Sequence, residues 1–117
     1  MVGAQYFVIP VVIPNGTSVM AAAADLSGYS LVGLEMPAAW TAANLTFQAS
    51  GVAAASAANM YDSSGVEYTV TVSTSRYVPV SPVDFIGVKF LVVRSGTGGT
   101  PVAQGADRTI NLICRSM

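Results

Sequence analysis

The sequence predicts an all-β protein, a single β-sandwich or jelly-roll domain of about eight short antiparallel strands. Three observations support this prediction. Apolar and polar residues alternate with a period of two in several segments, turn residues separate these segments at short intervals, and no segment shows the longer period of an amphipathic helix. A chain of 117 residues suits one domain with its own core, which we assign to residues 1–117.

The segment Gln5–Ile13 is predicted as the first strand, because it is rich in Val, Ile and aromatic residues and ends at turn residues 14–16. Pro10 lies inside it and cannot donate a hydrogen bond to a neighbouring strand. The segment is therefore expected to be an edge strand, a bulged strand or an arm that reaches a neighbour. Residues 2–13 are the candidate N-terminal arm or edge strand.

Four elements are predicted in the next part of the chain, each bounded by turn residues. They are strands at Thr17–Ala23, Tyr29–Met36 and Asn44–Ser50, and a helical turn at Pro37–Ala43 that carries Trp40. Alanines in the first of these segments would also suit a short helix, but a strand fits better in a chain rich in β-structure. In the second segment, Val32, Leu34 and Met36 are expected to face the core.

The middle of the chain alternates short strands with turns and loops. The predicted elements are an Ala/Ser-rich loop at Gly51–Asn59, a short strand at Met60–Tyr61, a turn at Asp62–Gly65, strands at Val66–Val72 and Arg76–Val80, and a bend at Val83–Gly87. Alternation with a period of two is clearest in Val66–Val72. The bend is expected to anchor Phe85.

Two long strands joined by a glycine-rich loop are predicted at Val88–Ser95 and Thr109–Cys114. Both are apolar on one face and partly apolar on the other, where Leu91, Val93 and Ile113 lie. A strand that faces only solvent on its second side rarely carries such residues. The pair is therefore placed in the centre of a sheet or in a subunit contact.

Charged residues make up only 9% of the chain, against about 25% in an average soluble domain. The net charge of -1 is too balanced to hold a polyanion, so no nucleic-acid partner is expected. So few charges also give little electrostatic protection against association, which indicates a surface that neighbours cover. The longest apolar run, Tyr6–Ile13, is far shorter than the roughly 20 residues of a membrane helix. No membrane partner and no export signal are predicted.

Catalytic chemistry is not expected, because the sequence contains no histidine. A Ser/His/Asp or Cys/His relay cannot be built without one, and the acidic residues are scattered singly along the chain. The lone cysteine, Cys114, lies on an apolar strand face and is interpreted as a buried structural thiol. The prediction is a protein without enzymatic activity, cofactor or metal.

Aromatic side chains leave one alternative open, because exposed rings on a β-sandwich are a common way to bind sugars. Trp40 and Tyr61 lie near predicted loops and are the candidate glycan contacts. Packing in the core or in an interface is the simpler interpretation of the aromatic residues as a group. A carbohydrate-binding module that adheres to host glycans is therefore the second hypothesis.

Three segments together resemble a family of small virion structural proteins of tailed bacteriophages and prophages: YSLVGLEMPAAWTAANLTFQAS, VDFIGVKFLVVRSGT and PVAQGADRTINLICR. The resemblance covers residues 29–115. It implies attachment to the phage particle as a head decoration protein, or as another head, tail or neck component, and it implies no catalytic residues. The expected location is the capsid surface of the virion, after synthesis in the bacterial host cytoplasm.

The partners expected for such a protein are the major capsid protein and further copies of the same chain, in a symmetric homo-oligomer for which a trimer is favoured. Apolar strand faces would form these contacts, so that neighbours share in the stability of the small domain. The candidate subunit or capsid contacts are Tyr6, Phe7, Val8, Ile9, Leu91, Val93 and Ile113.

Overall fold

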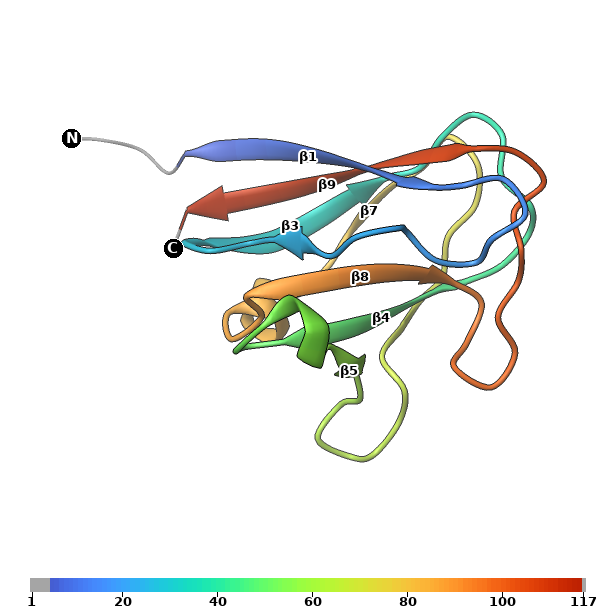
Figure 1. Cartoon of the computed structure of the whole chain (residues 1–117). Helices are drawn as coiled ribbons and strands as arrows, with labels where there is room; N and C mark the ends of the chain where they lie inside the picture. Colours follow the sequence, from blue (N-terminus) through green and yellow to red (C-terminus); the bar gives the residue numbers. More distant parts are fainter. Residues whose placement is uncertain (1–4, 117) are drawn as a thin grey trace.

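The computed structural model describes residues 5–116, and two antiparallel sheets form its framework (Figure 1). In chain order the strands are β1 (Tyr6–Ile13), β2 (Ala24–Asp25), β3 (Tyr29–Glu35), β4 (Leu45–Ser50), β5 (Ala58–Asn59), β6 (Thr69–Val70), β7 (Tyr77–Pro79), β8 (Phe90–Ser95) and β9 (Arg108–Ser116). Two short 3-10 helices, η1 (Ala54–Ser56) and η2 (Pro82–Phe85), interrupt the connections. The predicted all-β sandwich of short antiparallel strands is confirmed.

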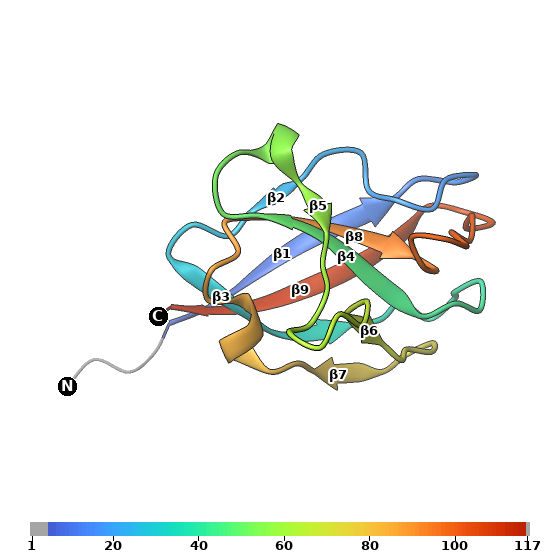
Figure 2. The ribbon, with the colours of Figure 1, turned by 90° about the horizontal axis from the view of Figure 1, so that it is seen from below.

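The two sheets have the strand orders β1-β9-β3-β7 and β2-β8-β4-β5, and β6 pairs with β4. We call them the β9 sheet and the β8 sheet after an inner strand of each. The pairing is nested, because β1 pairs with β9, β2 with β8, β3 with β7 and β4 with β5. This nesting wraps one long antiparallel ribbon around a core, which is the connectivity of a jelly roll. Figure 2 shows the β8 sheet lying across the β9 sheet.

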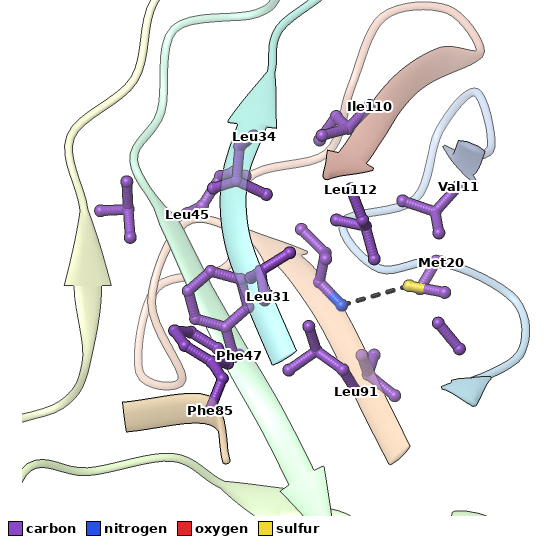
Figure 3. Packing of buried hydrophobic residues seen from close by; sticks show 14 of the residues in the cluster. Val11, Met20, Leu31, Leu34, Leu45, Phe47, Phe85, Leu91, Ile110 and Leu112 are labelled. Carbon is purple, nitrogen blue, oxygen red and sulfur yellow. Dashed lines mark hydrogen bonds between the residues drawn. The ribbon is translucent and has the colours of Figure 1, made fainter. Parts of the chain in front are cut away.

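The core lies between the two sheets and receives side chains from both (Figure 3). Phe47 of β4 and Phe85 of η2 are fully buried, and their rings meet edge to face with centroids 5.7 Å apart. The prediction that the bend at Val83–Gly87 anchors Phe85 is confirmed. From the β9 sheet, Ile110 and Leu112 are also fully buried.

Strands β8 and β9 are both inner strands, as predicted from their two-sided apolar character, but they belong to different sheets. The glycine-rich segment between them therefore crosses from one sheet to the other. Leu91 and Val93 point into the sandwich and are 0% exposed, so their interpretation as contact residues is wrong. Both faces of β8 are covered, because Val92 and Arg94 on its outer face are buried as well.

Strand β3 departs from the predicted alternation at a β-bulge between Leu31 and Gly33, where its register against β9 shifts. A bulge adds one residue to a strand and so reverses the direction of the side chains beyond it. Leu31 and Leu34 are consequently both fully buried, while Val32 is only half-buried. The prediction was correct for Leu34 and Met36 and wrong for Val32.

The predicted strand at Thr17–Ala23 is wrong, since this segment connects the sheets and only Val19 forms an isolated bridge, with Arg94. The predicted helical turn at Pro37–Ala43 is also absent. The backbone N–H of Thr41 there donates to the side-chain oxygen of Gln104 at 2.9 Å. The Thr41 N–H therefore bonds a side chain that is distant in sequence, whereas in a helix it would bond a nearby backbone carbonyl.

Two further predictions differ in extent from the structure. Within Val66–Val72 only β6 is a strand, although Val70 and Val72 are buried as the alternation predicts. The short strand expected at Met60–Tyr61 is found two residues earlier, as β5. Tyr61 itself forms only an isolated bridge, with Glu67. The strand β1, by contrast, matches the prediction closely and is an edge strand of its sheet. Its residues are therefore strand rather than free arm, and residues 2–4 lie outside the described part.

Candidate functional site

Strand β1 presents a row of apolar side chains on the outer face of the β9 sheet. Side chains alternate between the two faces of a strand, so every second residue of β1 points away from the core. Val11 and Ile13 are buried, whereas Tyr6, Val8 and Val12 are 67%, 52% and 43% exposed. Isolated exposed apolar residues are common, but several in one row mark a contact surface.

The apolar row continues across the sheet. Val8 lies opposite Ile113 of β9, and Ile113 lies opposite Gly33 of β3. Residues directly opposite each other have side chains on the same face. A Cβ atom added to Gly33 would collide with the hydroxyl end of Tyr77, so the Tyr77 ring covers this glycine on the same outer face. We call Val8, Ile113 and Tyr77 the apolar strip.

Beside the apolar strip, the outer face is hollowed by a cavity of about 420 Å³ lined by Ser30, Val32, Pro82, Ile86, Arg115 and Ser116. The Ser30 hydroxyl donates to the Pro82 carbonyl at 2.7 Å, which satisfies the polar group on the cavity wall. Ile86 is exposed at the cavity, and Arg115 is its charged residue. An apolar centre with polar groups at its margin is the usual composition of a protein interface.

The structure brings together three of the predicted contact residues, namely Tyr6, Val8 and Ile113. Phe7 and Ile9 point to the other face of β1, where the Phe7 ring packs edge to face on Tyr29 with centroids 4.2 Å apart. Leu91 and Val93 belong to the core, as described above.

Sequence reasoning missed Tyr77 and Ile86 as members of this surface. Tyr77 lies in a strand of only three residues, and Ile86 directly follows the 3-10 helix η2, so neither residue belongs to an alternating segment that would assign it to this face. Gly33 was the one available signal, because a glycine inside a strand often marks a place where another group approaches the backbone closely.

The candidate glycan contacts do not form a common platform of exposed rings. Trp40 is half-buried against the core, and its indole N–H donates to the carbonyl of Ala43 at 3.0 Å. Tyr61 is 55% exposed in the segment between β5 and β6. Among residues 5–116, the aromatic rings in mutual contact are those of Phe7 with Tyr29 and of Phe47, Tyr68 and Phe85.

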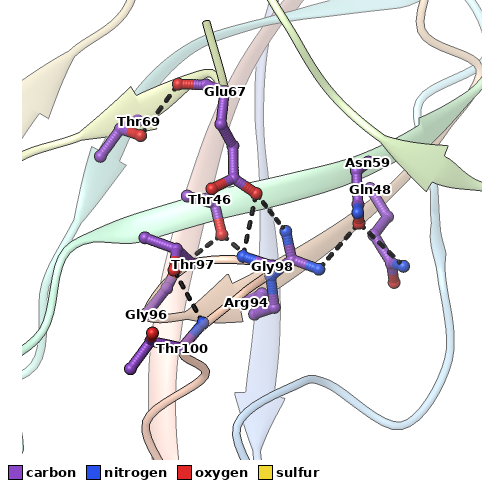
Figure 4. A network of polar contacts seen from close by, with 10 residues as sticks. All are labelled: Thr46, Gln48, Asn59, Glu67, Thr69, Arg94, Gly96, Thr97, Gly98 and Thr100. Atoms are coloured by element: carbon purple, nitrogen blue, oxygen red, sulfur yellow. Dashed lines mark hydrogen bonds and ion pairs between the residues drawn. The ribbon is translucent and has the colours of Figure 1, made fainter.

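The densest polar cluster surrounds Arg94 on the outer face of the β8 sheet (Figure 4). Its guanidinium group forms an ion pair with Glu67 at 2.9 Å, and the two side chains are only 10% and 17% exposed. It also donates to Thr46 and Asn59, both at 2.9 Å, while the N–H of Gly98 donates to Glu67 at 2.9 Å. These groups bind one another, so the cluster fastens the loops onto β4 and β8.

Among residues 5–116, three groups have perturbed pKa values. Hydrogen bonds from the Ser27 hydroxyl and backbone N–H lower the pKa of Asp25, which is exposed. The other two, Cys114 and Tyr68, pack in or against the core. Burial raises the pKa of the Cys114 thiol to about 11, which keeps it protonated and unreactive at neutral pH. Burial, helped by a 3.0 Å hydrogen bond to Asp84, raises the pKa of Tyr68 to about 12. Both values agree with packed structural positions.

Among residues 5–116, no three His, Cys, Asp or Glu side chains gather closely enough to hold a metal ion. In the same range, no helix has the length and apolar character needed to cross a membrane. No protein-family model, curated protein or solved structure matches the chain. The outer face of the β9 sheet, with the apolar strip and the adjoining cavity, is therefore the candidate functional site on geometric grounds.

Proposed function

We propose that the protein is a non-enzymatic structural protein of a bacteriophage virion, a head decoration protein that binds the major capsid lattice and stabilises the shell. The observation that carries this proposal is the apolar strip on the outer face of the β9 sheet. The virion is suggested by the resemblance to phage structural proteins. The low charge of the chain agrees with a surface that neighbours cover.

The apolar strip supplies the contact in this proposal. Full burial of an exposed large apolar side chain gives about 1.5–3 kcal/mol, so Val8, Ile113 and Tyr77 can anchor a subunit on a complementary surface. A subunit that binds only the assembled lattice stabilises that lattice by mass action. No residue of the decoration protein needs to carry out a reaction for this effect.

Two alternatives use the same molecule differently. A tail or neck component would use the same sheet face against another virion protein. A glycan-binding module would use Tyr61. Because Trp40 is half-buried and offers no exposed ring beside Tyr61, this alternative is weaker than the decoration proposal. The jelly-roll connectivity is found in viral capsid proteins and in lectins, so the fold alone favours neither function.

Binding to capsids of the encoding phage that lack this protein tests the proposal. Wild-type protein is expected to co-sediment with the capsids and to saturate at a fixed stoichiometry. Ile113→Lys places a charge in the apolar strip and is expected to weaken binding at least about 10-fold. Val52→Lys is the matched control, because Val52 is 81% exposed in the loop after β4, and it is expected to bind like wild type.

Several outcomes would contradict this function. Wild-type protein that stays in the supernatant, or Ile113→Lys binding that equals wild type, would remove the proposed contact. Binding to purified tails or necks in place of capsids would favour the second location. Sugar binding on a glycan array that is lost in Tyr61→Ala, together with indifference to capsids, would establish the carbohydrate-binding alternative.

A further inference from the structure

Strand β1 has a free edge. One of its sides pairs with β9, and within residues 5–116 its other side has no strand beside it. The Gln5 carbonyl accepts the N–H of Ser116 at 2.8 Å, and in an antiparallel pair alternate residues bond the neighbouring strand. Odd-numbered residues therefore bond β9. The even-numbered residues of β1 direct their backbone groups to the free edge: Tyr6, Val8, Pro10 and Val12.

The free edge explains the proline inside the strand. Pro10 lacks an N–H, and at an outward position this costs no hydrogen bond to β9. Proline on an exposed edge also limits uncontrolled strand pairing. The remaining outward groups are N–H donors at Tyr6, Val8 and Val12, with a carbonyl acceptor at each even position. An extended polypeptide segment is the chemical group that matches such a row.

An apolar groove of about 340 Å³ runs along the same edge. Residues 9–12 of β1 form one wall, and the connection Met20–Ala24 forms the other. β9 does not line the groove, so it opens on the free side of β1. A strand added beside β1 would point its inward side chains into this groove, since neighbouring strands place opposite residues on the same face.

A second copy of the chain supplies the best match to this edge. β1 has eight residues, whereas the other edge strands β2, β5 and β7 have two, two and three. Among the described edge strands, only another β1 can fill the length of the edge. No charged residue precedes Asp25 in the sequence, so two such edges meet without charge repulsion.

We propose that two copies of this chain pair through antiparallel β1 strands about a two-fold axis and join their β9 sheets into one continuous sheet. The register that places Tyr6 opposite the second copy's Val12, and Val8 opposite its Pro10, gives every outward N–H a carbonyl acceptor. Ile9 then lies on the axis, and each Ile9 points toward the groove of the other copy.

This pairing stands independently of the capsid function, because it depends only on the edge and the groove. It also differs from the trimer favoured by the sequence. A trimer needs β1 to meet a different surface of the next copy, whereas two identical edges form a closed, two-fold contact. The native mass of the isolated protein therefore distinguishes the two arrangements without any capsid.

Sedimentation velocity over a concentration series is the first measurement. Wild type is expected to reach twice the chain mass of 12.0 kDa. Val8→Pro removes an outward N–H while leaving the bonds to β9, and it is expected to raise the dissociation constant of the dimer about 10- to 100-fold. Val8→Ala keeps the N–H and is the matched control. Pro10→Thr adds a donor and is expected to tighten the dimer, and Ala22→Phe fills the groove and is expected to weaken it.

Amide hydrogen exchange of the wild type gives a second readout that does not depend on the folding of any variant. At dimer concentrations the N–H groups of Val8 and Val12 are expected to exchange as slowly as those of Phe7 and Ile9, and to exchange fast after dilution. Fast exchange of Val8 and Val12 at high concentration would overturn the pairing. A wild-type mass of one or three chains, or equal dissociation constants for Val8→Pro and Val8→Ala, would overturn it as well.

Discussion

Gln104 shows how a single side chain holds an irregular part of this fold. It is almost completely buried, and its side-chain oxygen accepts the N–H of Thr41 at 2.9 Å. Its side-chain nitrogen donates to the Thr41 carbonyl at 3.0 Å and to the Ser95 hydroxyl at 2.7 Å. The amide thus replaces backbone partners for the β3–β4 connection, which has no regular structure of its own.

We therefore expect Gln104→Leu, which keeps the size of the side chain, to lower the free energy of unfolding by about 2–4 kcal/mol, because the buried hydroxyl of Ser95 and the partly buried backbone groups of Thr41 lose their partners. Urea unfolding followed by fluorescence measures the change. Gln5→Leu is the control, because Gln5 is exposed at the start of the described chain. Equal unfolding free energies for the two variants would contradict this role.

Cys114 makes stability depend on pH in the alkaline range. Its pKa is raised from 9.0 to about 11 by burial, so the folded state holds the thiol proton more tightly than the unfolded state. This contribution is fully present below about pH 9 and is lost as the pH rises toward 11. The raised pKa of Tyr68 acts in the same direction between pH 10 and about 12.

Thermal unfolding midpoints are therefore expected to fall between about pH 9 and pH 11, and to fall less steeply in Cys114→Ala. The comparison uses the slope with pH and not the absolute midpoint, because Cys114→Ala also removes buried volume. A slope identical to that of wild type would show that the Cys114 thiol does not titrate in this range.

Among the elements, β1 has the clearest energetic role. Its register with β9 runs from Tyr6 opposite Arg115 to Ile13 opposite Arg108, and Val11 and Ile13 belong to the core. If residues 2–13 were an arm, one of the two roles predicted for them, they could be removed without unfolding the domain. The structure predicts the opposite, because the deletion exposes β9 and opens the core.

We expect a chain without residues 2–13 to lose cooperative thermal unfolding, as measured by circular dichroism. Val8→Ala, which keeps the whole strand, is expected to unfold cooperatively near the wild-type midpoint. A cooperative transition in the deletion variant would show that the domain folds without β1 and that this segment is an arm.

Strands in which apolar residues alternate over a long stretch could be predicted from the sequence. Strands that exist only because of their tertiary contacts could not. β1, β4, β8 and β9 each repeat apolar residues at alternate positions over six or more residues. The two-residue strands β2, β5 and β6 have no such period, since their pairing partners define them. The candidate site divides in the same way. Val8 and Ile113 follow from alternation, but Tyr77 enters only because β3 brings Gly33 beneath it.

At the scale of the whole molecule, the low charge has two separate consequences. Part of the small set of charged groups is used inside the fold, where Arg94 and Glu67 hold loops against the β8 sheet. The apolar strip on the outer face of the β9 sheet adjoins the free edge of β1 through Val8, and β1 itself contains no charged residue. A homodimer formed at the edge would therefore extend the apolar strip across two copies, giving a broader surface for a lattice to bind.

The nested strand order also determines how early the domain can fold while the chain is being synthesised. β9 lies between β1 and β3, so the β9 sheet cannot close until the residues of β9 have been translated and have left the ribosome. Until then, the growing chain holds β1 and β3 without the strand that joins them. Contacts between segments so distant in sequence form slowly, and unpaired strand edges are prone to aggregation. Folding of the described domain therefore waits until β9 has left the ribosome, and Pro10 on the edge of β1 limits unwanted strand pairing during that interval.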